Sequence, residues 1–414
     1  MSVSLAPLID SEIGPLEGVI LHPPGPEIEN MSPLEAERAL YSDILNLGVA
    51  TAEYAQLAGV LRRVCRVFET GELLTETLAD PATRRELIAA VCRNEAADCL
   101  CDELATLDPA ALTAALIGGV PLRRDTLTSF LSRGIHALRP LHNLFFMRDT
   151  AAVVGRHVLL SRMANAVRER ESLLMAAVFA RHPLFRAPVI DPIDAPGATI
   201  EGGDVLVARS DVLIVGIGAR TTPQAVDFLI ARVCADGGTR HVVVQELPTT
   251  PESFIHLDMV FTLLDRDLCL VHAPVVLQPS RLATVHITVE GGCVTTIRQE
   301  TGLLPVLRRL GLDLEPVSCG GDDPAAQERE QWHSGANAFA FAPGKVLVYG
   351  RNARTLAELD RRGFAIVPAR DVIDGRADLT AMRRCAVTIE GAELARGGGG
   401  CRCMTLPVRR APLA

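Results

Sequence analysis

The sequence lacks the features that mark membrane proteins and nucleic-acid-binding proteins. No uninterrupted apolar run approaches the length of a membrane span, and the first residues, MSVSLAPLIDSEIG, contain no basic segment followed by an apolar core. Runs of Lys and Arg with interleaved aromatic residues are also missing, and the formal net charge is -9. We therefore expect a cytoplasmic protein with neither a membrane nor a nucleic acid as partner, and its acidity suits a cationic small substrate.

Cysteine is present, but not in the pattern of a structural metal site. The 11 cysteines form an odd total at irregular spacing. The pairs Cys99/Cys101 and Cys401/Cys403 are too close for the usual zinc spacing, and disulfides between residues two apart are strained. We expect reduced thiols, with at most one of them catalytic, and we interpret Cys401 as incidental.

The N-terminal region predicts a strand-helix-strand unit. With 414 residues, of which 48% are hydrophobic, the chain can build a sizeable core in one or two domains. Its apolar patterns indicate strands at 17–25 and 65–68, and helices at 34–47 and 52–64.

The next segment, 70–137, changes in character. Asp80-Pro81, Asp108-Pro109 and a Gly-Gly pair separate alanine- and leucine-rich stretches whose apolar residues recur at three- and four-residue steps. We predict a small all-helical domain at 70–137, inserted into a larger α/β domain formed by 1–69 and 138–414.

A recurring pattern follows the insertion. A polar signature opens a hairpin of two short apolar strands, and an amphipathic helix and a buried strand come next. The N-terminal unit, completed by the C-terminal strand CMTLPV, makes a fifth copy. We therefore predict a closed, pseudo-fivefold α/β arrangement that gathers the polar signatures at one end of its axis. The four hairpins are expected at 143–163, 201–218, 256–274 and 337–350.

The segment RGGGGCRCM near the C-terminus is the candidate for the nucleophile. Four glycines let a ligand approach the main chain, and Cys403 just after them would face it. Taken alone, the segment is better explained as a flexible C-terminal tail with two buried or oxidisable thiols. The interpretation depends on the residues that the predicted closure brings near Cys403.

Those residues are a histidine and several carboxylates. Each has a plain structural interpretation: Asp149 could cap a strand, Glu201 and Asp204 could shape the turn between them, and His256 and Asp258 could form a hydrogen-bonded pair. Together with a thiol they supply what attack on a guanidinium carbon requires. Carboxylates bind the planar cation bidentately, the thiolate attacks, and the imidazole protonates departing ammonia.

Several stretches resemble motifs of the arginine deiminases, in the same order and over nearly the whole chain. They are SEIGPLEGVILHPPG, NLFFMRDT, EGGDV, HLDMVFT, CGGDDPAAQEREQWHSGANAFAFAPG and RGGGGCRCMTLPVRR. The resemblance implies a five-bladed α/β propeller of the pentein type. It also implies hydrolysis of L-arginine to L-citrulline and ammonia without metal or cofactor, and a homo-oligomer such as a dimer or tetramer.

The resemblance also implies a role for each candidate residue. Cys403 attacks the guanidinium carbon, and His256 protonates ammonia and then activates the water that hydrolyses a thiouronium intermediate. Asp149 and Asp258 clamp the guanidinium, and Glu201 orients His256. The resemblance assigns the remaining positions to the pocket and its support: Asp204 beside Glu201, Arg168 and Arg220 at the substrate α-carboxylate, and Asn143 and Phe146 at other pocket positions.

Two places depart from the family pattern, which usually has adjacent aspartates after the first strand and a Glu-His pair on the next helix. Here they read ALYSD (39–43) and AEYAQ (52–56). We expect this region to belong to the loop covering the substrate, which leaves open a deiminase that acts on a different guanidino compound. The residues also leave open an amidinotransferase and a non-catalytic scaffold or metal-binding protein.

Overall fold

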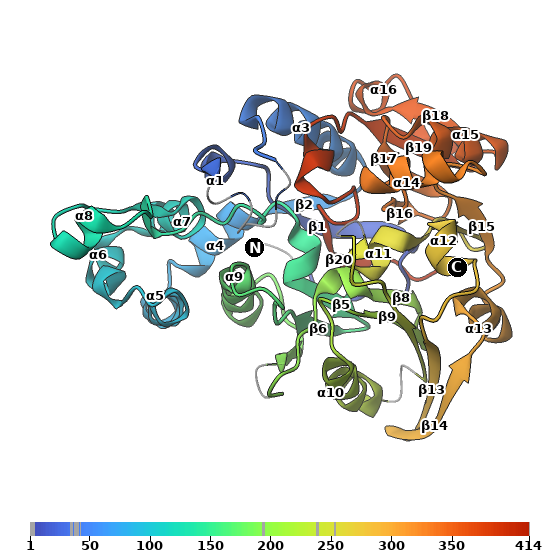
Figure 1. Ribbon diagram of the computed structural model, residues 1–414, viewed down its shortest axis with the longest axis horizontal. Coiled ribbons are helices and arrows are strands. Elements are labelled where there is room, and N and C mark those ends of the chain that lie inside the picture. The colour runs from blue at the N-terminus through green and yellow to red at the C-terminus, as the bar shows by residue number, and fades with distance from the viewer. Residues whose placement is uncertain are drawn as a thin grey trace.

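The computed structural model describes residues 5–33, 36, 41, 43–192, 195–236, 240–251 and 254–413. Across these residues the strands form five sheets of three to five strands and one two-stranded pair. Figure 1 shows the sheets in the body of the molecule, with helices around them and an arm of helices on one side. The prediction of a mixed α/β fold is confirmed.

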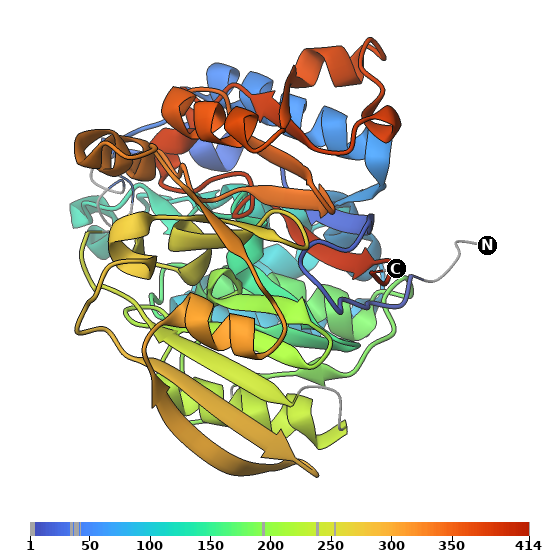
Figure 2. The same ribbon diagram turned by 90° about the vertical axis from the view of Figure 1, so that its right-hand side faces the viewer.

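The first sheet brings the two ends of the described chain together. β1 (Leu16–Leu21) runs parallel to β2 (Arg66–Glu69) and antiparallel to β20 (Leu406–Arg410). Figure 2 shows the red C-terminal strand lying against the blue N-terminal one. The predicted pairing of the C-terminal strand with the N-terminal unit is therefore confirmed.

The helices of this unit differ from the prediction. α1 (Pro26–Glu29) is a single turn after β1. Half of the helix predicted at 34–47 lies outside the described residues, and the described residues 43–46 are not helical. α3 (Leu47–Val64) begins five residues before the predicted start, because the Asn46 side chain accepts a hydrogen bond from a first-turn N–H and caps the helix there.

Four further units share one connection pattern. In each, an antiparallel hairpin leads through a helix to a strand that pairs in parallel with the hairpin's second strand. The hairpins are β5 (Ala151–Val154) with β6 (His157–Leu160), β8 (Val205–Arg209) with β9 (Val212–Ile217), β11 (Phe261–Leu263) with β12 (Leu268–Val271), and β16 (Phe339–Ala342) with β17 (Lys345–Tyr349). The helices and returning strands are α9 (Glu169–Arg181) and β7 (Val189–Ile190), α10 (Pro223–Val233) and β10 (His241–Glu246), α13 (Leu303–Arg309) and β15 (Glu315–Ser318), and α15 (Ala353–Arg361) and β19 (Cys385–Ile389).

Two strand pairings were not predicted. A second hairpin, β13 (Thr284–Glu290) with β14 (Cys293–Glu300), extends the sheet of β8, β9 and β10. In the last unit β18 (Ala365–Pro368) pairs with β19 rather than with β17. Short helices fill the remaining connections: α11 (Leu257–Val260), α12 (Ala273–Val276), α14 (Pro324–Trp332) and α16 (Ala369–Ile373).

The segment predicted as a helical insertion forms the arm at the left of Figure 1. Asp80 and Asp108 accept hydrogen bonds from first-turn N–H groups and cap their helices, as predicted. The segment is not entirely helical, however, because β3 (Val120–Pro121) pairs with β4 (His136–Leu138) after Gly119 ends a helix at φ +85°. The helices are α4 (Thr70–Thr77), α5 (Pro81–Glu95), α6 (Cys101–Thr106), α7 (Pro109–Gly118) and α8 (Leu127–Leu131).

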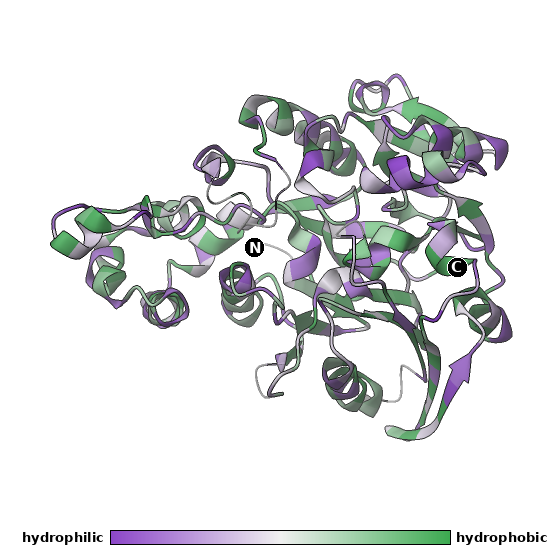
Figure 3. Cartoon of the chain, viewed as in Figure 1, coloured by the Kyte–Doolittle hydropathy of each residue, from purple (hydrophilic) through white to green (hydrophobic). Residues whose placement is uncertain are grey.

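Apolar side chains fill the interior of both parts. One buried cluster runs from the helices of the arm through the sheets of β5 to β10, and two others fill the remaining sheets. Figure 3 shows the hydrophobic residues concentrated on the central strands and the hydrophilic ones on the outer helix faces. Within the described part of the chain, no helix has both the length and the apolarity needed to cross a membrane.

Candidate active site

The glycine-rich segment is a packed loop rather than a flexible tail. Cys403 is 3% exposed, and the loop enters through a 3-10 turn at Leu394–Gly397. Gly398 has φ +89°, a left-handed conformation that favours glycine. A Cβ at Gly399 would collide with the ring of Phe146. The glycines therefore let the backbone lie directly against an aromatic ring and fix the approach to Cys403; we call residues 390–404 the nucleophile loop.

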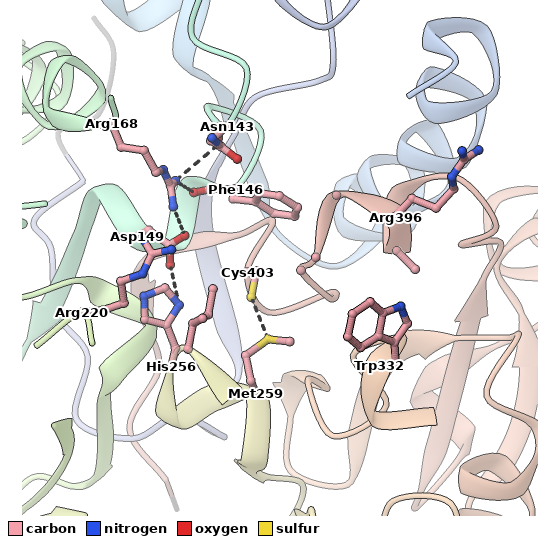
Figure 4. A pocket seen from close by; sticks show the side chains of 15 residues that line it. Asn143, Phe146, Asp149, Arg168, Arg220, His256, Met259, Trp332, Arg396 and Cys403 are labelled. Carbon is pink, nitrogen blue, oxygen red and sulfur yellow. Dashed lines mark hydrogen bonds and ion pairs between the residues drawn. The ribbon is translucent and has the colours of Figure 1, made fainter. Parts of the chain in front are cut away.

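One pocket collects most of the predicted site residues (Figure 4). Its lining adds an outer rim that was not predicted, formed by Ile255, Trp332 and Arg396. Seven of the ten predicted residues line it: Asn143, Phe146, Asp149, Arg168, Arg220, His256 and Cys403. The other three are carboxylates outside the lining: Glu201 contacts His256, Asp258 contacts Cys403, and Asp204 contacts Leu257 and Thr221.

His256 is held between two carboxylates. Its Nε2 lies 2.8 Å from Oε2 of Glu201, and its Nδ1 lies 3.6 Å from Oδ1 of Asp149. Burial disfavours the imidazolium, but the charge of Asp149 and the hydrogen bond to Glu201 outweigh it and raise the pKa of His256 to about 9. A Cβ on Gly203 would lie 2.7 Å from Cγ of His256, so the EGGD glycine is needed for this approach. The site therefore holds a charged imidazole at neutral pH.

Cys403 lies beside Asp258. Its Sγ is 3.8 Å and 3.9 Å from the two carboxylate oxygens and 3.7 Å from Sδ of Met259. Burial, with the charges of Asp258 and Asp149, raises the pKa of the Cys403 thiol well above its ordinary value. In the empty pocket Cys403 is therefore held as the protonated thiol.

The two arginines expected at the substrate carboxylate already contact carboxylates of the protein. Arg168 is buried. Its Nη1 lies 2.6 Å from Oδ2 of Asp149, and its Nη2 lies 2.8 Å from Oε2 of Glu171. Arg220 lies 3.5 Å from Glu201, and 11% of its side chain is exposed. Arg220 is thus the more accessible of the two, and their assignment to the α-carboxylate stays a prediction.

Asp204 does not line the pocket. Its carboxylate accepts hydrogen bonds from the Leu257 N–H at 2.8 Å and from the Thr221 hydroxyl at 2.6 Å. Burial raises the pKa of Asp204 to about 7. The contacts fix the start of α11 and with it His256, which matches a supporting role.

Three residues that organise the site were missed. Asn337 donates from Nδ2 to the Asp258 carbonyl at 3.0 Å, and its Oδ1 accepts from the N–H groups of Arg402 and Cys403 at 2.9 and 3.1 Å. Arg402 donates to the Asp258 carboxylate at 2.7 Å, and the Tyr349 hydroxyl donates to the Gly399 carbonyl at 2.9 Å. The motifs SGANAFAFAPG and RCM contain Asn337 and Arg402, but spacing alone did not reveal these contacts.

The expectation for AEYAQ was wrong. These residues lie inside α3 and not in a loop over the substrate, because the helix begins at Leu47 and the run falls within its second and third turns. Most of ALYSD lies outside the described residues. Its last residue, Asp43, forms an ion pair with Arg396, and the Asn46 N–H donates to Glu393 at 2.5 Å. The N-terminal segment thus reaches the rim through Asp43.

One group in the described part of the chain has ligand atoms close enough together for a metal ion. Single atoms of Asp149, Glu201 and His256 lie within 4.8 Å of one another. Arg168 and Arg220 already pair with these carboxylates, and a protonated imidazole cannot bind a metal. The group is better suited to a cationic ligand than to a metal ion.

The fold and the pocket define an α/β enzyme with a buried cysteine, an imidazole and a set of carboxylates suited to a cation. Residues 121–410 match the family described as arginine deiminase. An arginine deiminase of Mycobacterium marinum is 33% identical over 419 residues, with 98% of each chain covered. One of Streptococcus equi subsp. zooepidemicus is 32% identical over 429 residues, with 97% of each covered. The chain belongs to the arginine deiminase family.

Solved structures share the fold at low sequence identity. The N-terminal domain of ArgZ, covalently bound to a reaction intermediate, has a TM-score of 0.53 at 14% identity over 95% of this chain and 98% of its own. A dimethylarginine dimethylaminohydrolase adduct with S-methyl-L-thiocitrulline has a TM-score of 0.51 at 14% identity, covering 94% of this chain and 99% of its own. At this identity the likeness shows the fold.

Proposed function

We propose that this protein hydrolyses L-arginine to L-citrulline and ammonia through a covalent intermediate on Cys403. The observation that carries the proposal is a buried carboxylate oxygen without a hydrogen-bond partner. In the described residues, Oδ1 of Asp149 accepts no hydrogen bond, although Oδ2 receives Arg168. A buried anionic acceptor beside a thiol and facing a pocket fits a guanidinium N–H.

The reaction proceeds in two halves. Asp149 and Asp258 bind the guanidinium, the Cys403 thiol releases its proton to solvent as the cation binds, and Sγ forms a bond to the guanidinium carbon. The C–N bond breaks as His256 gives its proton to departing ammonia, which leaves a thiouronium. His256, now neutral, takes a proton from water as the oxygen bonds to the same carbon. The S–C bond then breaks while the hydroxyl proton passes to Sγ, which releases citrulline and restores the thiol.

The charges of the site link binding to reactivity. Asp258 and Asp149 oppose the thiolate in the empty pocket, and a bound cation between them reverses that effect. The substrate therefore lowers the pKa of the group that attacks it. The thiol stays protected until a guanidinium arrives.

We make a further proposal about the blade arrangement, the domain boundaries, the assembly and the location of the protein. We propose that the five sheets are the blades of a pseudo-fivefold propeller, that 70–137 is an inserted domain, and that the protein works as a homo-oligomer in the cytoplasm. The repeated hairpin-helix-strand connection and the pairing of β1 with β20 support the closed arrangement.

The test is release of ammonia and citrulline from L-arginine by the purified protein in EDTA, beside Cys403→Ala. We expect turnover that survives chelation and is lost in the variant. Omitting any acceptor amine separates hydrolysis from amidino transfer. If the protein hydrolyses agmatine or a methylated arginine and not L-arginine, the proposed reaction stands and the proposed substrate is wrong. Activity in Cys403→Ala would reject the covalent mechanism.

A further inference from the structure

The AEYAQ run turns three polar side chains towards the nucleophile loop. These are Glu53, Tyr54 and Gln56, all of them buried. The loop starts after β19 and leads to Cys403.

Glu53 holds the start of the loop. Its two carboxylate oxygens accept four hydrogen bonds from three successive backbone N–H groups, those of Ala392, Glu393 and Leu394, at 2.7 to 3.1 Å. Glu53 is 2% exposed. A buried carboxylate that is bound by consecutive amides fixes their orientation, and any shift of the loop start would leave part of that charge unsatisfied.

Gln56 binds Glu390, the first residue of the nucleophile loop. Its Nε2 donates to the Glu390 carboxylate at 3.0 Å, and its Oε1 accepts from the Glu390 N–H at 3.0 Å. One face of α3 therefore binds the loop start from 390 to 394.

Tyr54 holds the end of the loop. Its hydroxyl donates to the Met404 carbonyl at 3.3 Å and accepts from the His22 N–H at 3.1 Å. Met404 follows the nucleophile directly, and the His22 contact joins α3 to the end of β1. The helix thus contacts the backbone on both sides of the glycine run.

This geometry matters because the segment between the two contacts is rich in glycine. Glycines lose more conformational freedom on ordering than other residues do, so the loop needs external contacts to hold one conformation. A misplacement of about 1 Å in a reacting group can cost on the order of 100-fold in rate.

We infer that Glu53 and Tyr54 are positioning residues that hold the nucleophile loop and place Cys403 against Asp258. The inference rests on the proposed function, since it assigns α3 a part in the reactivity of Cys403. It predicts that α3 controls turnover more than substrate affinity, although no α3 side chain lines the pocket.

Glu53→Gln and Tyr54→Phe test the two contacts. Gln cannot accept from all three amides, and Phe removes only a hydroxyl, so the second variant stays informative if the first folds poorly. We expect kcat for L-arginine to fall about 10- to 100-fold in Glu53→Gln and about 3- to 10-fold in Tyr54→Phe, with KM within about threefold. The control is Thr51→Ala, which removes a hydroxyl on the same helix that bonds Pro24 and not the loop.

A second readout needs no arginine turnover. We expect iodoacetamide to alkylate Cys403, followed on its peptide by mass spectrometry, at least threefold faster in both variants because the buried thiol becomes accessible, and at the wild-type rate in Thr51→Ala. Unchanged kcat or unchanged alkylation in folded Tyr54→Phe would overturn the inference. Wild-type protein that leaves arginine intact would reject the proposed function, while the alkylation rates would still decide whether α3 holds the loop.

Discussion

The inner wall of the pocket and its outer rim differ in burial and in charge. The inner wall contains Asp149, Arg168 and His256, with Glu201 behind them, and all four are at most 3% exposed and joined by ion pairs and hydrogen bonds. At the rim Trp332 is 56% exposed, and Arg396 contacts Asp43 near the surface. The comparison predicts that the part of a substrate beside His256 meets a rigid set of charges, whereas a part that reaches the rim meets groups that can adjust.

The largest effect is expected at the inner wall, in Asp149→Asn. The variant keeps the shape of the side chain but removes a buried charge that faces both Arg168 and the substrate. Loss of one partner of a buried, hydrogen-bonded charge pair between protein and ligand costs about 4 kcal/mol of binding energy, so kcat/KM for L-arginine should fall about 1,000-fold. Steady-state kinetics check this, with circular dichroism to confirm folding. A loss below tenfold would place the guanidinium elsewhere.

The second effect concerns His256 as a proton donor. Its raised pKa keeps the imidazole charged at neutral pH, so kcat should fall about tenfold per pH unit above about 9 as the donor loses its proton. Glu201→Gln removes a carboxylate that raises this pKa, so it should lower kcat about 100-fold and move the alkaline limb to lower pH. An alkaline limb that stays in place would show that another group titrates.

The raised pKa of His256 also makes the free energy of unfolding depend on pH. The folded pKa of His256 lies above its ordinary value of 6.5, so the stabilisation is fully present below pH 6.5 and is lost as the pH rises through about 9. Thermal melts of the wild type should show a falling Tm across this window. Glu201→Gln should show a smaller fall, and an equal fall would assign the linkage to other groups.

A smaller effect is expected at the rim, in Trp332→Ala. The indole lines the pocket and lies on the opposite side of Cys403 from His256 in Figure 4. Loss of its contact area should raise KM for L-arginine about fivefold and leave kcat within about twofold, and Trp332→Phe should recover most of the loss. A change in kcat alone would contradict the division of the pocket into two parts.

The smallest effect is expected for the ion pair between Asp43 and Arg396. Exposed ion pairs contribute little and are screened by salt, so Asp43→Ala should change KM by about twofold at low ionic strength and less at about 0.5 M NaCl. Arg396→Ala should behave in the same way. A tenfold change in KM would show that this ion pair contributes to substrate binding as strongly as the inner-wall residues do.

The sequence predicted the inner wall better than the rest of the molecule. The pocket brings together three residues from short motifs whose residue types indicate their chemistry: Cys403, His256 and Asp149. Asn337 and Tyr349 act through backbone groups of the loop, so their residue types alone carry no signal. The β13–β14 hairpin and the short β3–β4 pair depend on pairings between distant residues that local patterns do not encode.

The AEYAQ run shows that likeness to a family motif can also predict a wrong position. Its residues were expected over the substrate because a departure from a family motif was placed by likeness alone. Apolar spacing had already predicted a helix there, and the helix decided where Glu53 and Tyr54 point. Local periodicity was the better guide to position than the motif.

The pairing of β1 with β20 has a consequence for synthesis. The first strand of the described chain cannot complete its sheet until the last one has left the ribosome, nearly 400 residues later. The thiol lies just ahead of that last strand. A polypeptide interrupted before Cys403 lacks both the β20 pairing and the thiol on which the proposed reaction depends, so incomplete copies released by the ribosome are expected to be inactive.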